Sequence, residues 1–181
     1  MPSPSDVDDT PSSSGRKPRA EPESESCSGS DSSDGSDPKS LPERLQILTF
    51  TLGDERYCVR TDAVATVLGV SDAAPIVRAD DPWNAASISV DGERVRVVHL
   101  ARVFATSSAS DTPPTDPKLL VLGHTDGDGR YYGWLVDRVG TTETVTRDAL
   151  EPTRVTTSHV EGRFVFEDGD AILVDERVML G

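Results

Sequence analysis

From Leu45 onward, the chain consists of short runs of β-forming residues separated by turn residues. Asp-Gly dipeptides stand between such runs at Asp91-Gly92 and Asp168-Gly169, and the segment Asp126–Gly129 contains two more. Asp and Gly both tolerate the positive φ that a two-residue hairpin turn requires. Short, evenly spaced strands joined in this way are typical of small β-barrels. We therefore expect an all-β fold.

Alternation of apolar and polar residues supports the strands. In the run 93–100, Val95 and Val97 face one way while Arg94 and Arg96 face the other, as in a strand with one side in the core. The runs expected to form strands are Leu45–Leu52, Arg56–Arg60, Ala85–Val90, Glu93–Leu100, Lys118–Thr125, Arg130–Asp137, Gly140–Arg147, Val160–Glu167 and Asp170–Val174.

Two segments have a helical pattern instead. In Ala63–Leu68, the residues Val64, Val67 and Leu68 would share one side of a short helix, and Asp175–Leu180 resembles a closing helical turn. We expect the helix at 63–68 either to cap the core or to present a groove.

The chain changes composition before the first strand. Residues 1–42 are Ser, Asp, Glu, Pro and Gly with almost no large apolar side chain, so they are expected to form a disordered acidic tail. Residues 43–181 are expected to fold. The Ser/Thr/Pro/Asp-rich loop Ala105–Pro117 would join a first barrel, about 45–105, to a second barrel, about 117–181.

The net charge of −14 argues against nucleic acid and against anionic membrane surfaces, because both require a basic footprint. Lysine occurs only three times, whereas arginine is used throughout. This pattern suggests a halophilic protein, because concentrated salt screens repulsion across a dense acidic surface. No apolar run approaches a membrane span and the N-terminus lacks a signal sequence, so a cytoplasmic location is expected.

Motifs of catalysis and of metal binding are missing from the sequence. There is no phosphate-binding loop, no H-E-x-x-H and no G-x-S-x-G, and the histidines lack ligand spacing. Cys58 falls in an expected strand and is interpreted as a small buried apolar residue. The expected protein is therefore not an enzyme, with no catalytic residue, metal or cofactor.

The order of motifs resembles the CheW family of prokaryotic chemotaxis coupling proteins. Phe50–Tyr57 reads F-x-L-G-x-E-x-Y, and Gly133–Val139 is similar to the family's G-L-V-V-D-x-V. The other similar segments are Val64–Val67 at V-x-E-I, Ala86–Leu100 at the G-V-I-N-L-R-G hairpin, and Val160–Asp175 at the closing hairpin.

The resemblance covers about 45–180 and implies two five-stranded β-barrels side by side, with short helices. It also implies an adaptor that couples the cytoplasmic tips of chemoreceptors to the regulatory domain of a CheA-type histidine kinase. Such an adaptor works in the cytoplasm, recruited to receptor arrays without membrane insertion, and binds through apolar grooves and strand edges.

The family pattern implies a set of partner-binding positions. These are Val64, Thr66, Val67, Asp91, Gly92, Val136 and Val139. Val136 and Val139 are expected to serve the core and barrel junction more than a partner surface.

The sequence departs from the family at four positions. Asp91 stands at the arginine of L-R-G and Thr66 at the glutamate of V-x-E-I, while Arg96 and His99 replace a proline and an aspartate. These changes can be explained by a tighter turn on a salt-adapted surface that has replaced an interface. They can equally be explained by a change in which partner the protein binds. A divergent scaffold that no longer couples receptor to kinase is therefore an alternative. An oligonucleotide-binding barrel and an unrecognised hydrolase are further alternatives, with less support.

Overall fold

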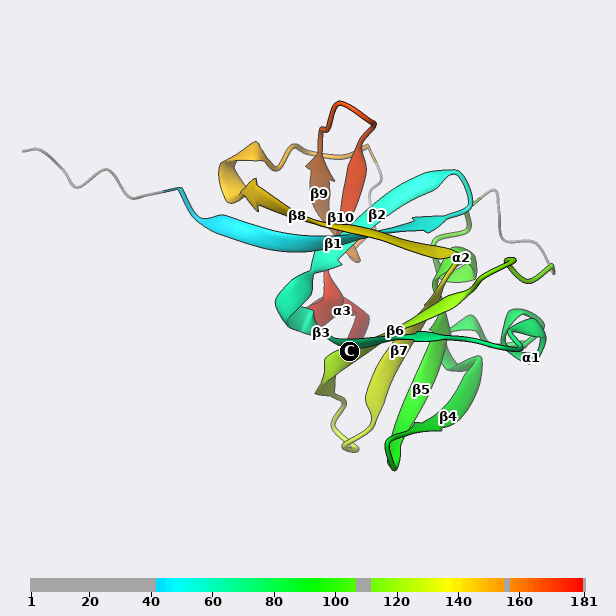
Figure 1. Ribbon diagram of the computed structural model, residues 1–181. Coiled ribbons are helices and arrows are strands. Elements are labelled where there is room, and N and C mark those ends of the chain that lie inside the picture. Colours follow the sequence, from blue (N-terminus) through cyan, green and yellow to red (C-terminus); the bar gives the residue numbers. More distant parts are fainter. Residues whose placement is uncertain (1–41, 107–111, 155–156, 181) are drawn as a thin grey trace, which may run out of the picture. The chain divides into compact units, whose positions relative to one another are not determined.

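The computed structural model describes residues 42–106, 112–154 and 157–180, which form mainly strands in two five-stranded sheets (Figure 1). The first sheet has the order β8-β1-β2-β10-β9, built from β1 (Arg44–Leu52), β2 (Glu55–Arg60), β8 (Arg138–Thr146), β9 (Val160–Phe164) and β10 (Ala171–Val174). The second has the order β3-β6-β7-β5-β4, built from β3 (Val64–Gly69), β4 (Ala86–Val90), β5 (Glu93–His99), β6 (Lys118–Thr125) and β7 (Tyr131–Val136). The predicted fold class is confirmed, although neither hydrogen-bonded order closes into a complete barrel.

The helices are short, and all but the last connect consecutive strands along the chain. They are α1 (Ala74–Val77), α2 (Leu100–Val103) and α3 (Glu176–Leu180), with single 3₁₀ turns η1 (Thr61–Ala63), η2 (Pro82–Asn84) and η3 (Arg147–Ala149). The predicted closing helical turn is confirmed as α3. The predicted tail lies outside the described residues.

The predicted helix at Ala63–Leu68 is wrong. Only its first residue belongs to a helical turn, η1, and the remainder forms strand β3. In β3 half-buried and exposed residues alternate, and Val67 and Leu68 pair with Leu120 and Leu119 of β6. The apolar spacing of this short segment fits a helix and a strand equally, and antiparallel pairing with a buried strand decides between them.

The expected division into consecutive barrels, 45–105 and 117–181, does not match the two sheets. Strands β1 and β2 pair with β8 and β10, so the first sheet combines both ends of the domain. The second sheet takes the strands between them. Cys58 of β2 and Leu173 of β10, which are in parallel register, are both fully buried. The free energy gained by burying these apolar strands exceeds the small additional entropic cost of closing the long loop between them.

The central apolar cluster joins the two sheets. It contains Phe50 and Val59 from the first sheet, Trp134 and Val136 from the second, and Met179 from α3. Each sheet also buries a separate cluster on its other side. Strand β7 therefore has apolar contacts on both faces, since Leu135 belongs to the second sheet's own cluster.

Candidate functional site

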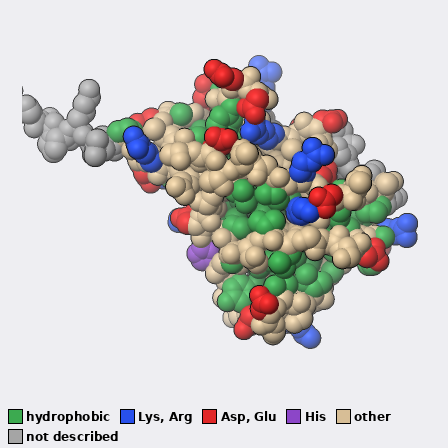
Figure 2. Space-filling view, in the orientation of Figure 1, with side chains coloured by type: hydrophobic (Ala, Val, Ile, Leu, Met, Phe, Trp, Pro, Cys, Tyr) green, Lys and Arg blue, Asp and Glu red, His purple; other side chains and the backbone are tan. Residues whose placement is uncertain are grey.

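Hydrophobic side chains reach the surface between the segments labelled β8 and β3, where the two sheets meet (Figure 2). Among the apolar residues that pack, half-buried, against the central cluster are Leu48 of β1, Val64 of β3 and Val139 of β8. We call these three residues the apolar rim. They are close enough to water to contact a partner and are supported from below by a packed core.

The expected site residues on β3 fall on opposite faces. Val64 and Val67 pair with Leu122 and Leu120 of the central cluster, so they share a face, and Val67 is 39% exposed. Thr66 is half-buried and pairs with Val121 on the other face, because a β-bulge between Val64 and Thr66 reverses the alternation. Strand β3 is the first strand of its sheet, so one side of its backbone has no neighbouring strand in the described fold. Val64 and Val67 thus share one face of an edge strand and not the face of a helix.

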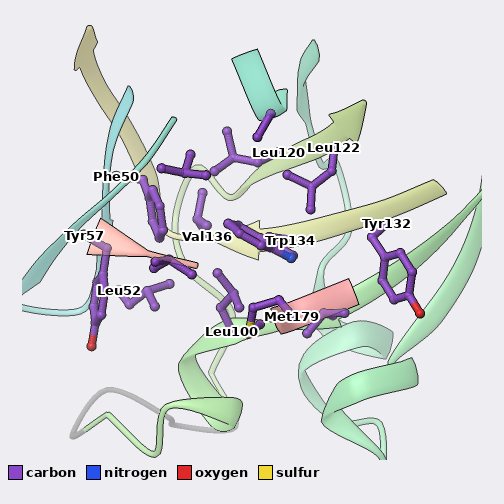
Figure 3. Packing of buried hydrophobic residues seen from close by; sticks show 14 of the residues in the cluster. Phe50, Leu52, Tyr57, Leu100, Leu120, Leu122, Tyr132, Trp134, Val136 and Met179 are labelled. Atoms are coloured by element: carbon purple, nitrogen blue, oxygen red, sulfur yellow. The ribbon is translucent and has the colours of Figure 1, made fainter. Parts of the chain in front are cut away.

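The two valines of the V-D-x-V motif differ in accessibility. Val136 is fully buried and lies beside Trp134 in the central cluster (Figure 3). Val139 is half-buried and pairs with Phe50 of β1. Val136 therefore cannot contact a partner without disruption of the core, whereas Val139 is placed to do so.

Asp91 and Gly92 lie in the exposed turn between β4 and β5, at the opposite edge of the sheet from β3 in the hydrogen-bonded order. Their φ angles of 51° and 89° are those of a type I′ turn, as the Asp-Gly signal predicts. A left-handed φ favours Asp, Asn or Gly, so backbone geometry accounts for Asp91 without reference to a partner.

Asp137 of the V-D-x-V motif links two separate motifs of the sequence. Its carboxylate oxygen Oδ2 accepts a hydrogen bond from the backbone N–H of Gly53 at 2.5 Å, and its own N–H donates to the carbonyl of Thr51 at 3.1 Å. The L-G turn and the V-D-x-V segment are therefore joined in space. Asp137 holds the β1–β2 turn against the start of β8.

A largely buried ionic cluster connects β2, β9 and α3. Arg60 of β2 contacts Glu161 of β9 at 2.6 Å and Glu176 of α3 at 3.1 Å. Burial by itself lowers the pKa of Arg60, but the hydrogen bonds and negative charges of the two glutamates outweigh it and raise that pKa. The residues are spread over 117 positions, since they run from 60 to 176, so no local motif could reveal the cluster.

Burial shifts the pKa of two described side chains, Cys58 and His99. Burial raises the pKa of the Cys58 thiol to about 12, which keeps it protonated and unreactive near neutral pH. Burial, together with the nearby positive charge of Arg102, lowers the pKa of His99, and Asp137 opposes this effect. Within the described ranges, no group of three or more potential ligands is placed to hold a metal. None of the described helices has the length and apolar character to cross a membrane.

The comparisons with known proteins agree with this geometry. A model of the CheW-like domain family matches residues 46–179. The scaffolding protein TtCheW from Thermoanaerobacter tengcongensis has a similar fold, with a TM-score of 0.62 and 18% identity over 79% of this chain and 92% of that chain. A search of curated proteins found no match. The family match covers most of the sequence, and the chain belongs to the CheW-like domain family.

Proposed function

We propose that this protein is a non-catalytic adaptor of chemotaxis signalling, which couples chemoreceptor tips to the regulatory domain of a CheA-type histidine kinase. It works in the cytoplasm and requires no cofactor. Its chemistry is recognition, through an apolar surface on a rigid β scaffold.

The observation that supports this proposal most is the apolar rim beside an uncharged sheet edge. Leu48, Val64 and Val139 rest on the central cluster, and Val67 on β3 is one of three large apolar side chains that are exposed among the described residues. Strand β3 contains no charged residue, although 28% of the chain is charged. An exposed apolar surface with an open strand edge is typical of a binding site for another protein.

A binding experiment on Val67 tests the proposal. The full chain is mixed with the kinase regulatory domain and with a receptor signalling fragment, and affinity and kinase activity are measured. We expect Val67→Glu to weaken at least one complex about tenfold or more, because a charge would be buried in an apolar contact.

Val165→Glu is the matched control, because Val165 is 56% exposed but follows β9 in the other sheet. It should leave both affinities unchanged. Wild-type protein that binds neither partner, or equal effects of the two substitutions, would contradict the coupling function.

The second candidate is a scaffold that keeps the fold but no longer couples receptor to kinase. The charge reversal at Asp91 and the loss of charge at Thr66 favour it. Asp91→Arg would restore coupling if the turn retained its family role. The left-handed φ at this position penalises arginine, so Asp91→Asn, which tolerates that φ, is the required control for turn stability.

A further inference from the structure

The outer part of the β4–β5 hairpin contains two arginines, Arg94 and Arg96, beside the acidic residues Asp91 and Glu93. Arg94 and Arg96 lie two residues apart on β5, so their side chains share one face of the sheet. Glu93 alternates onto the opposite face. Among the described residues, neither arginine has an ion-pair partner, whereas Arg60 and Arg163 each contact two carboxylates. Two uncompensated guanidinium groups side by side form a local site for anions.

Neighbouring strands supply hydroxyl groups to the same face. Ser87 and Ser89 of β4 are exposed and stand directly opposite Arg96 and Arg94 in the antiparallel register. On the other side of β5, Tyr132 of β7 is in register with Arg96. Because directly opposite residues share a face, these side chains form one array of guanidinium and hydroxyl donors. We call this array the Arg-Ser face.

Arg96 is held in place before any ligand arrives. Its guanidinium carbon lies 5.7 Å from the centre of the Tyr132 ring, in a cation–π contact. Its Nε atom is buried and has no hydrogen-bond acceptor within the described structure. A guanidinium already held against the Tyr132 ring loses little further conformational entropy when its outer N–H groups bind a carboxylate.

The hairpin also leaves room beside the Arg-Ser face. A cavity of about 400 Å³ is lined by Ser87, Ile88, Ser89, Gly92 and Arg94. The small serine side chains leave this space open on β4, which is the last strand of its sheet (Figure 1).

The free edge of β4 lacks the features that usually block strand addition. It contains no charged residue and no proline, whereas the edge strands of the other sheet, β8 and β9, contain Arg138, Glu143, Glu161 and Arg163. A segment added beside β4 would place alternate side chains over the serines. The added segment would then lie two strand spacings, about 10 Å, from β5. A glutamate of the segment and an arginine of β5 can bridge this distance when their side chains extend toward each other.

We propose that β4 and the Arg-Ser face bind an extended acidic segment of a partner protein, with backbone pairing along β4 and carboxylates at alternate residues directed to Arg94 and Arg96. Charge complementarity selects this occupant, since the chain's net charge of −14 would repel an acidic segment at most other places. This surface lies apart from the apolar rim, so the proposal does not depend on the coupling function.

Fluorescent peptides test the inference with the full chain and with neither receptor nor kinase present. A short peptide of alternating Thr and Glu is compared with Thr-Gln and Thr-Lys peptides by anisotropy at about 0.1 M and about 1 M KCl. We expect the Glu peptide to bind with the highest affinity and this affinity to fall at the higher salt concentration. In NMR spectra the peptide should selectively shift the amide resonances of residues 86–96.

Substitutions then locate the site. Arg94→Glu with Arg96→Glu should reduce affinity for the Glu peptide about tenfold or more, and the milder Arg94→Gln should reduce it less without any risk to folding. Arg44→Glu is the matched control, because Arg44 is exposed on the other sheet and forms no ion pair among the described residues.

Any of four results would overturn the proposal. The Glu peptide could fail to bind, it could bind no better than the Gln peptide, or its affinity could be unaffected by the changes at Arg94 and Arg96. Preferential binding of a thymidine oligonucleotide of equal charge would assign the Arg-Ser face to nucleic acid instead, and would also overturn it.

Discussion

Gly162 lies where a side chain has no room. A Cβ atom at this position would be 2.6 Å from the backbone oxygen of Glu151, in the isolated bridge between Glu151 and Arg163. We expect Gly162→Ala to lower the free energy of unfolding by about 1–3 kcal/mol, because the rigid backbone must move to relieve the contact. Urea denaturation measures the change.

Gly69→Ala provides the control for this prediction. A Cβ atom at Gly69 would meet nothing within 4 Å, and its φ is not in the left-handed region. The free energy of unfolding should therefore change little. Similar losses in both variants would show that backbone conformation, and not the contact with Glu151, determines the requirement for glycine.

His99 should make stability depend on pH. Its pKa in the folded protein lies below the ordinary value of 6.5, so the unfolded chain binds a proton first as the pH falls. The contribution to stability is complete above about pH 6.5 and is lost as the pH falls through the folded-state pKa, with a slope of at most about 1.4 kcal/mol per pH unit. Urea denaturation between pH 7 and pH 5, about the range concerned, measures it.

His99→Gln should flatten this pH dependence, since glutamine does not titrate. His124→Gln is the control, because His124 is exposed at the end of β6. A pH dependence that persists in His99→Gln would assign the effect to carboxylates elsewhere.

At the scale of elements, α3 is held to the first sheet by ionic contacts. Arg60 is 12% exposed and Glu176 is 4% exposed in their side chains, and Met179 of α3 packs into the central cluster. Arg60→Met leaves the partly buried Glu161 without a cation and the buried Glu176 with only the longer contact to Arg177, at 4.0 Å. We expect a loss of roughly 3–5 kcal/mol in the free energy of unfolding, because uncompensated buried charge is costly.

Arg163→Met is the matched comparison, because Arg163 also contacts two carboxylates but its side chain is 41% exposed. Solvent screens these contacts, so the expected loss is about 1 kcal/mol or less. If the two substitutions cost the same in thermal or urea unfolding, burial is not what makes the Arg60 cluster important.

Strands were predicted correctly from the sequence where the residues of a turn specify its backbone conformation. The Asp91-Gly92 turn fixed the β4–β5 hairpin and its register, because few residues adopt two successive positive φ angles. The prediction failed at β3, where six residues of ambiguous apolar spacing became a strand only through pairing with β6. The Arg60 cluster was also invisible, since three distant elements contribute one residue each.

At the scale of the whole molecule, the net charge of −14 predicts that salt stabilises the fold. We expect the melting temperature of the full chain to rise between about 0.1 M and about 2 M KCl, because screening weakens repulsion among surface carboxylates. Thermal unfolding followed by circular dichroism provides the measurement.

A variant with Asp62→Asn, Asp148→Asn and Glu167→Gln is the control. These three residues are exposed and form no ion pair within the described part of the chain. The variant should be more stable in low salt and gain less from added KCl. An unchanged response would attribute the salt effect to hydration of apolar surface.

The sequence by itself determined the β class, the hairpin turns and the family, because each depends on local backbone preferences or on motifs a few residues long. Only the tertiary structure decided which strands share a sheet, which of the expected site residues are accessible, and where uncompensated charge remains. Val136 and Val139 belong to one motif, yet one is fully buried and the other half-exposed. The accessibility of a side chain depends on which strands pair, and these can lie about a hundred residues apart in the sequence, as β2 and β10 do. Local sequence does not specify such distant partners.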